Sequence, residues 1–159
     1  MSDLYLSVSI DNQMSKTMGP IGLHYDDRMR VLELLLDNTV FMTKRMFEHL
    51  REVFADIVMP THNIVITNGQ GEIGESFLQS GKNVVIIGCP ELLPKALRVV
   101  KRVIRTTYNY GLSGPKVPVP SFTEASGWIR ESTYTRSNEE SSEIVNDVYT
   151  LETFVKDES

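Results

Sequence analysis

Two basic residues, Lys44 and Arg45, open a predicted helix directly after the short apolar strand of residues 39–42. A helix N-terminus presents backbone N–H groups without intrahelical partners, and its dipole favours negative charge. These groups together with two cations have the chemistry of a phosphate site, because arginine also makes bidentate phosphate contacts. The alternative is a solvated basic pair on the surface of the helix.

Three further candidates stand where predicted elements begin or end. Asp26 and Asp27 start a predicted helix, where acidic residues also serve simply as caps and first-turn acids. Cys89 follows a strand, either as a reactive thiol at a helix N-terminus or, as we expect, as a small buried residue. Because Cys89 is the only cysteine, no internal disulfide is possible, and we expect a reducing, cytoplasmic compartment.

Length and composition exclude several classes of protein. The 159 residues suit one domain spanning residues 1–159, and 41% apolar with 23% charged residues is typical of a globular protein. The start, MSDLYLSVSI, alternates like a strand and lacks the basic region of a signal peptide, and no apolar run is long enough to cross a bilayer. The net charge of -5 argues against broad nucleic-acid binding. We therefore expect a small-molecule substrate and neither nucleic-acid nor membrane partners.

Strands and helices alternate along the first two thirds of the sequence. Alternating or continuous apolar runs predict strands over 4–10, 39–42, 63–67, 83–87 and 101–108, with a long loop over 12–24. Helices are predicted from Asp26 or Asp27 onward, over about 44–54, over 73–80, and from Pro90 over the segment PELLPKAL. The apolar side of the first helix comprises Met29, Val31, Leu32, Leu35 and Leu36.

This alternation predicts an α/β fold with a mainly parallel sheet and helices on both faces. Two further alternating runs, 128–135 and 145–155, predict an antiparallel hairpin at the edge of the sheet. Ligands of such sheets bind beyond the carboxyl ends of the central strands. The loops after residues 10, 42, 67 and 87 are therefore the places to expect chemistry.

An ordered set of segments spanning nearly the whole chain resembles the dihydrofolate reductase family. TVFMTKRMFEHL resembles its strand followed by Gly-Arg/Lys-x-Thr, and HNIVITN resembles its next strand. NVVIIGCPELLPKAL resembles the strand that ends in Ile-Gly-Gly, and its Gly-x-Pro-x-Leu-Leu pattern resembles phage members. KRVIRTTYN resembles the strand with a pocket-facing threonine, and SVSIDNQMS resembles the first strand and closing loop. Trp128 and the segment 145–152 match the C-terminal pair in position.

The resemblance implies hydride transfer from NADPH to dihydrofolate, giving tetrahydrofolate. It also implies one pocket carboxylate that hydrogen-bonds the pterin, and burial of a carboxyl raises its pKa toward neutrality. Counting back from TVFMT selects Asp27, which we favour, whereas counting forward from Pro20 selects Asp26. Thr107 matches the threonine that bonds this carboxylate, the alternative being an ordinary strand threonine. Arg105, two residues earlier, lies on the same strand face as Thr107 and would stabilise the anion if it reached it.

The resemblance also assigns the ligand contacts. Its substrate-binding positions are Tyr5, Leu6, Val31 and Ile87. Its cofactor-binding positions, for NADPH, are Ser7, Ser15, Thr43, Lys44, Arg45, Met46, Thr67, Asn68, Gly88, Cys89, Pro90 and Glu91. No metal is expected.

Several positions depart from the family pattern. Ile21 replaces a loop tryptophan, Thr43 and Cys89 replace glycines, Met46 replaces a phosphate-capping threonine, and polar Arg28 follows the carboxylate. Thr61 stands where the family has an arginine that binds the glutamyl tail of folate. Losing such a bidentate partner costs about 2 kcal/mol or more.

Three hypotheses follow from these matches and departures. The first is an NADPH-dependent dihydrofolate reductase. The second is a catalytically silent protein on the same fold that binds a protein partner. The third is a reductase of another small pterin or pyrimidine without a glutamyl tail, which Thr61 suggests.

Overall fold

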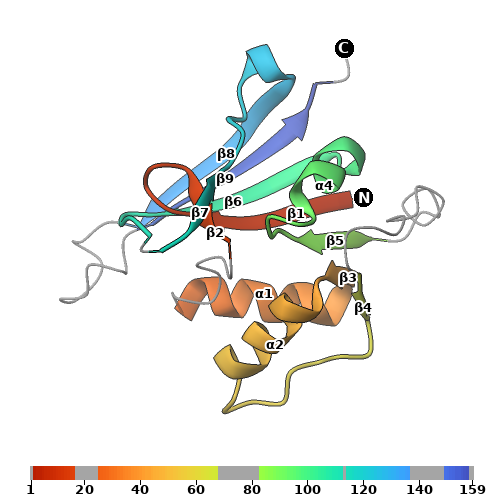
Figure 1. The fold of residues 1–159 in the computed structure, drawn as a ribbon. Helices are drawn as coiled ribbons and strands as arrows, with labels where there is room; N and C mark the ends of the chain where they lie inside the picture. The colour runs from red at the N-terminus through yellow and green to blue at the C-terminus, as the bar shows by residue number, and fades with distance from the viewer. Residues whose placement is uncertain (1, 17–24, 68–82, 113, 137–148, 158–159) are drawn as a thin grey trace.

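A seven-stranded sheet in the order β4-β3-β5-β1-β6-β9-β8 runs through the protein (Figure 1). The computed structural model describes residues 2–16, 25–67, 83–112, 114–136 and 149–157. The strands are β1 (Ser2–Val8), β3 (Thr39–Met42), β4 (Ile64–Ile66), β5 (Val84–Ile87), β6 (Arg102–Tyr108), β8 (Trp128–Arg136) and β9 (Tyr149–Lys156). The alternating and apolar runs of the sequence thus form strands within a few residues of their predicted bounds.

The first five strands of this order are parallel, and the last two are antiparallel. β1 pairs in parallel with both β5 and β6, and β3 pairs in parallel with β4 and β5. β9 pairs antiparallel with β6 and with β8. Every residue of β1 and β5 is buried, because both strands lie in the middle of the sheet between packed layers. The predicted mainly parallel sheet with a C-terminal antiparallel pair is confirmed.

Three helices of the described residues pack against the sheet: α1 (Tyr25–Asp37), α2 (Lys44–Val53) and α4 (Leu93–Val99). α1 and α4 lie on opposite sides of β1 (Figure 1). α1 is rich in the strong helix formers Leu, Arg, Glu and Met, and it ends where the Asn38 side chain bonds the Leu34 carbonyl at 3.0 Å. α2 begins after Thr43, whose hydroxyl accepts the Met46 N–H. None of the helices among the described residues has the length and apolar character needed to cross a membrane.

Four details differ from the expectations. α4 begins at Leu93 rather than Pro90, with Pro94 in its first turn. A helix starting at Pro90 would place Pro94 in the interior, where proline removes a hydrogen bond and clashes. Leu36 of α1 is 55% exposed, although it was expected on the apolar side. The other two differences concern loops.

Within the expected loop of residues 12–24, Gln13–Ser15 forms β2 and pairs antiparallel with β7 (Lys116–Pro118). Neither three-residue strand carries a pattern long enough for sequence reading to find. A 3-10 turn, Glu124–Ser126, precedes β8 and was not expected either. The expected helix over residues 73–80 lies outside the described residues.

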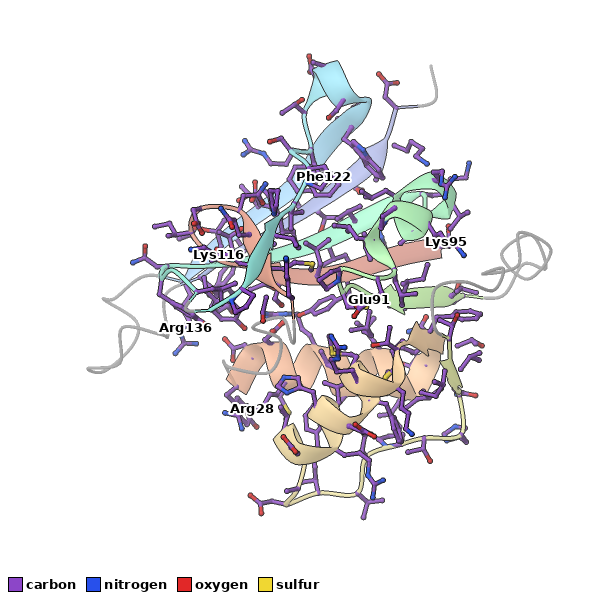
Figure 2. The ribbon with its side chains drawn as sticks, viewed as in Figure 1. Arg28, Glu91, Lys95, Lys116, Phe122 and Arg136 are labelled. Atoms are coloured by element: carbon purple, nitrogen blue, oxygen red, sulfur yellow. The ribbon has the colours of Figure 1, made fainter. Side chains whose placement is uncertain are left out.

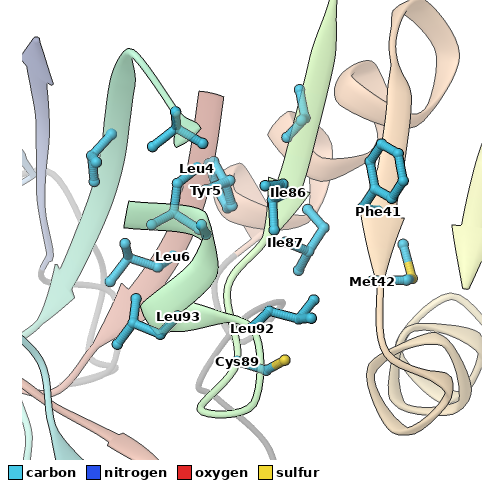
Figure 3. Close-up of a cluster of buried hydrophobic side chains, with 14 of the residues drawn as sticks. Leu4, Tyr5, Leu6, Phe41, Met42, Ile86, Ile87, Cys89, Leu92 and Leu93 are labelled. Carbon is cyan, nitrogen blue, oxygen red and sulfur yellow. The ribbon is translucent and has the colours of Figure 1, made fainter. Parts of the chain in front are cut away.

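The core is centred where α4 meets β1 and β5. Leu93 lies on the side of Leu6 of β1, and Leu92 extends toward the side of Ile87 of β5 (Figure 3). The backbone leaves β5 at Gly88, whose N–H bonds the Tyr5 carbonyl at 2.7 Å. A Cβ at this glycine would lie 2.9 Å from Leu6 Cβ and 3.2 Å from the Tyr5 carbonyl oxygen. Close packing of β1 against the end of β5 therefore requires glycine here.

We expect Gly88→Ala to lower the free energy of unfolding by about 1–3 kcal/mol, because the added methyl group overpacks the core. Gly111→Ala is the matched control, since nothing lies within 4 Å of a Cβ at Gly111. Urea unfolding measures both variants. Equal stability of the two variants would show that the space between Gly88 and Leu6 can accommodate a methyl group.

Candidate active site

The carboxylate of Asp27, in the first turn of α1, is completely buried between this helix and the sheet. A charge removed from water is tolerated only when hydrogen bonds or an opposite charge compensate it. The free N–H groups and the dipole of the helix N-terminus contribute part of that compensation. The rest comes from side chains of β1 and β6.

Four hydroxyl groups of these two strands donate hydrogen bonds to Asp27. Tyr5 of β1 and Thr106 of β6 bond Oδ1, the latter at 3.5 Å. Ser7 and Tyr108 bond Oδ2 at 3.3 Å and 2.7 Å. Both oxygens thus act as acceptors, as those of an ionised carboxylate do. The four groups are two i, i+2 pairs, which strand geometry places on one face of the sheet.

Arg30, one turn along α1, contacts both Asp27 and the Tyr5 hydroxyl. Its NH2 lies 3.9 Å from Asp27 Oδ1, and its Nε donates to the Tyr5 hydroxyl at 3.4 Å. Its guanidinium lies over the Tyr149 ring, 5.1 Å from the centroid. Arg30 therefore places a positive charge beside the buried carboxylate and connects α1 to β9.

Asp26, the neighbouring acid, points to the C-terminal hairpin instead. Arg136 NH1 lies 3.0 Å from Asp26 Oδ2, and the Tyr149 hydroxyl donates to the same oxygen at 2.9 Å. Arg136 lies at the end of β8, on the side of the molecule where α1 begins (Figure 2). The Asp26 side chain is one-third exposed, so this contact ties β8 and β9 to α1. Of the two candidate carboxylates, Asp27 is the one within the helix–sheet interface.

Tyrosine rings surround the carboxylate. The Tyr108 ring lies 5.5 Å from that of Tyr110 and 6.3 Å from that of Tyr149, between centroids. Burial, and secondarily the charge of Asp27, raises the pKa of Tyr110 to about 12. Burial also raises the pKa of Tyr149, and its bond to Asp26 acts in the same direction against the opposing effect of Arg30. Both phenols are therefore neutral at neutral pH.

Sequence reasoning did not single out Tyr108, Tyr110 or Tyr149. The i, i+2 spacing of Thr106 and Tyr108 was a usable signal, because Tyr5 and Ser7 have the same spacing on the adjacent strand. Nothing in the sequence indicated Tyr149, whose partner Asp26 is 123 residues away.

The expected position of Thr107 beside the carboxylate is wrong. Thr106, not Thr107, bonds Asp27, and Thr107 lies on the opposite face of β6 with Arg105. Arg105 pairs with Glu152 at 2.9 Å and does not reach Asp27. Because strand side chains alternate, an assignment that is one residue out moves the side chain to the other face.

The first turn of α2 holds the predicted phosphate residues. Lys44 and Arg45 are exposed, whereas Thr43 and Met46 are buried and joined by the helix cap at 3.1 Å. Arg45 NH1 lies 3.1 Å from Glu91 Oε1 and donates to the Lys16 carbonyl at 3.0 Å. The structure therefore brings Thr43, Lys44, Arg45, Met46 and Glu91 to one place. The Glu91 carboxylate pairs with one NH group of the Arg45 guanidinium.

The end of β5 lies beside this turn. Cys89 is 4% exposed, and its Sγ lies 3.9 Å from Thr43 Oγ1 (Figure 3). Burial raises the pKa of the Cys89 thiol to about 11. Cys89 is therefore a neutral buried thiol in the structure. Pro90 stands in the turn that precedes α4, and the described residues contain no cis peptide bond.

The remaining predicted contacts are divided between two faces of the sheet. Tyr5 and Ser7 contact Asp27, whereas Leu6 packs against Gly88 on the other side of β1. Val31 and Ile87 lie in the core. Thr67 follows β4 and bonds the Met42 carbonyl, and Ser15 lies in β2. Asn68 lies outside the described residues.

The strand order, the crossover helices and the antiparallel C-terminal pair define a dihydrofolate-reductase-like α/β fold. A solved structure that shares it is a dihydrofolate reductase from Enterococcus faecalis complexed with NADP(H) and RAB-propyl. The superposition covers 99% of this chain and 97% of that one, with a TM-score of 0.65 and 14% sequence identity. No family model and no curated protein sequence matches the chain. At this identity the likeness establishes the fold alone.

The donor set of α2 fits the phosphates of a dinucleotide in its chemistry. Lys44 and Arg45 are exposed cations at the N-terminus of a ten-residue helix, beyond the carboxyl end of β3. Such a turn binds anions through backbone N–H groups, its dipole and its cations. Arg45 can exchange its exposed contact with Glu91 for a phosphate, because exposed ion pairs contribute little stability.

We expect Cys89 to resist thiol reagents at pH 8 in the folded protein, because a thiol with a pKa near 11 is almost entirely protonated there. Unfolding in urea should restore the reactivity of an ordinary cysteine. Dithionitrobenzoate titration with and without urea measures this difference. Rapid, stoichiometric labelling of the folded protein would contradict the buried placement of Cys89.

Proposed function

We propose that this protein is an NADPH-dependent reductase that reduces a C=N bond of dihydrofolate to give tetrahydrofolate. The observation that carries the proposal is the buried Asp27 carboxylate in the first turn of α1, facing the carboxyl halves of β1 and β6. Ligands of parallel α/β sheets bind at this end. A carboxylate so placed can orient a ring that offers N–H donors and can handle its proton.

The residues divide into two groups in this proposal. Asp27 would accept hydrogen bonds from the substrate in place of some of its hydroxyl partners, of which Tyr5 and Tyr108 have the longest side chains. Lys44 and Arg45 would hold the phosphates of the cofactor. NADPH supplies the hydride when it is bound. Arg30 would hold positive charge near the carboxylate through the cycle.

A second candidate function is that of a catalytically silent protein that binds a protein partner, and the same cluster supports the absence of catalysis. All four hydroxyl groups around Asp27 already donate to it, so the carboxylate is satisfied without a ligand. A substrate must displace some of these bonds, and each is worth about 1.5–3 kcal/mol when its acceptor is charged. The cluster can thus serve stability alone.

We expect the purified protein to oxidise NADPH in the presence of dihydrofolate, followed by the loss of nicotinamide absorbance. Asp27→Asn should lower kcat/KM by about 10²-fold or more, because it removes the proton-handling group of the site. Asp26→Asn is the matched control: it makes the same chemical change at the neighbouring acid and should retain most of the activity.

Thermal unfolding of both variants establishes that each remains folded. Turnover on a pterin or pyrimidine without a glutamyl tail, but not on dihydrofolate, would assign the activity to that narrower class. Absence of NADPH binding to the wild-type protein would exclude the reductase and favour the silent protein.

We expect Lys44→Gln and Arg45→Gln each to weaken NADPH binding by about tenfold, because each removes a charged contact to phosphate. Arg98→Gln, which removes an exposed cation from α4 instead, should leave binding unchanged. Titration of cofactor fluorescence measures the three dissociation constants. Equal losses of NADPH affinity in all three variants would show that the net charge of the protein, and not the first turn of α2, determines the affinity.

A further inference from the structure

A cavity of about 290 Å³ lies along α1 on the side of Arg30. Four α1 residues and three residues outside this helix form its walls: Arg30, Glu33, Leu34 and Asp37, with Asn38, Tyr5 of β1 and Ile104 of β6. We call it the α1 cavity. We propose that Tyr5 relays protons between Asp27 and water in the α1 cavity, a role that rests on the function proposed above.

The first step of the argument is the position of the Tyr5 side chain. Its hydroxyl donates to Asp27 Oδ1 and receives the Nε–H of Arg30 at 3.4 Å. Both Tyr5 and Arg30 line the α1 cavity. Asp27 is completely buried and does not line the cavity, so Tyr5 is a residue that contacts both the carboxylate and the cavity.

The second step is the opening of the cavity. Glu33 and Asp37, one turn apart on α1, are exposed and also line the cavity. Their side chains connect its interior to the solvent, and their negative charge raises the local concentration of protons. Water that enters the cavity from the side of α1 therefore contacts the wall to which Tyr5 belongs.

The proton transfer balances without any further reactant. The hydroxyl proton of Tyr5 moves to Oδ1 of the ionised Asp27, which passes one proton to the substrate during turnover and returns to the carboxylate. A proton from water in the α1 cavity then binds the Tyr5 oxygen, and a proton from bulk solvent converts the resulting hydroxide back to water. One O–H bond forms for each that breaks, and Tyr5 ends the cycle as a neutral phenol.

Other polar groups face Asp27, and they differ from Tyr5 in one respect. Ser7 of β1, Thr106 and Tyr108 of β6, and Arg30 of α1 surround the carboxylate. Of these, only Arg30 also lines the α1 cavity, and a guanidinium has hydrogen-bond donors but no acceptor that could receive a proton. Tyr149 of β9 contacts Arg30 rather than the cavity.

The kinetic test compares Tyr5→Phe with Tyr108→Phe, because each removes one tyrosine hydroxyl from Asp27 and only Tyr5 lines the α1 cavity. We expect Tyr5→Phe to lower kcat by about tenfold or more with little change in KM, and to raise the solvent deuterium isotope effect on kcat. Tyr108→Phe should not raise that isotope effect. Equal isotope effects in the two variants would overturn the relay.

A second test needs no turnover and therefore separates failure of the relay from failure of the proposed function. Exchange of the Tyr5 hydroxyl proton with water is measured by NMR in the wild-type protein and in Glu33→Trp, which covers the mouth of the cavity at an exposed position. We expect at least fivefold slower exchange for Tyr5 and no change for Tyr108. Glu52→Trp, the same substitution on the exposed surface of α2, is the control. Unchanged Tyr5 exchange in Glu33→Trp would overturn the proposal whether or not the protein is a reductase.

Discussion

A buried carboxylate imposes a strict condition on the structure around it, because an ionised group without partners is far too costly in an apolar interior. Asp27 meets this condition through hydroxyl groups of two adjacent strands. The parallel register that pairs Ser7 with Thr106 places these groups on the face covered by α1. A slip of one residue in β1 would present Leu6 to the carboxylate, and a slip of one residue in β6 would present Thr107. The register of β1 and β6 and the position of α1 are therefore a single constraint.

The antiparallel edge of the sheet is also connected to the surroundings of Asp27. β8 and β9 meet α1 through Asp26, which binds both Arg136 and Tyr149. Arg30 extends from this contact back to Tyr5 and Asp27. The antiparallel pair is thus joined to the site by a continuous series of polar contacts, beyond the pairing of β9 with β6.

Fold and chemistry are separable in this protein. The hydroxyl groups that make burial of Asp27 tolerable are also the groups that a substrate must displace. At the other end of the candidate site, Gly88 is required by the packing of β5 against β1, independently of any cofactor. The features that stabilise the fold therefore coincide with positions where a reductase would carry its function.

By itself the sequence determined the alternation of strands and helices, the mainly parallel sheet and the bounds of 39–42, because hydrophobic periodicity is a local property. The family resemblance, counted back from that strand, also favoured Asp27 over Asp26 as the candidate carboxylate. Tertiary structure decided which of two adjacent threonines faces Asp27, since Thr106 and Thr107 are alike until the register fixes the faces of β6. It also decided the pairing of β2 with β7 and the contact of Tyr149 with α1, because both join segments about a hundred residues apart whose individual patterns are too short or too ordinary to predict.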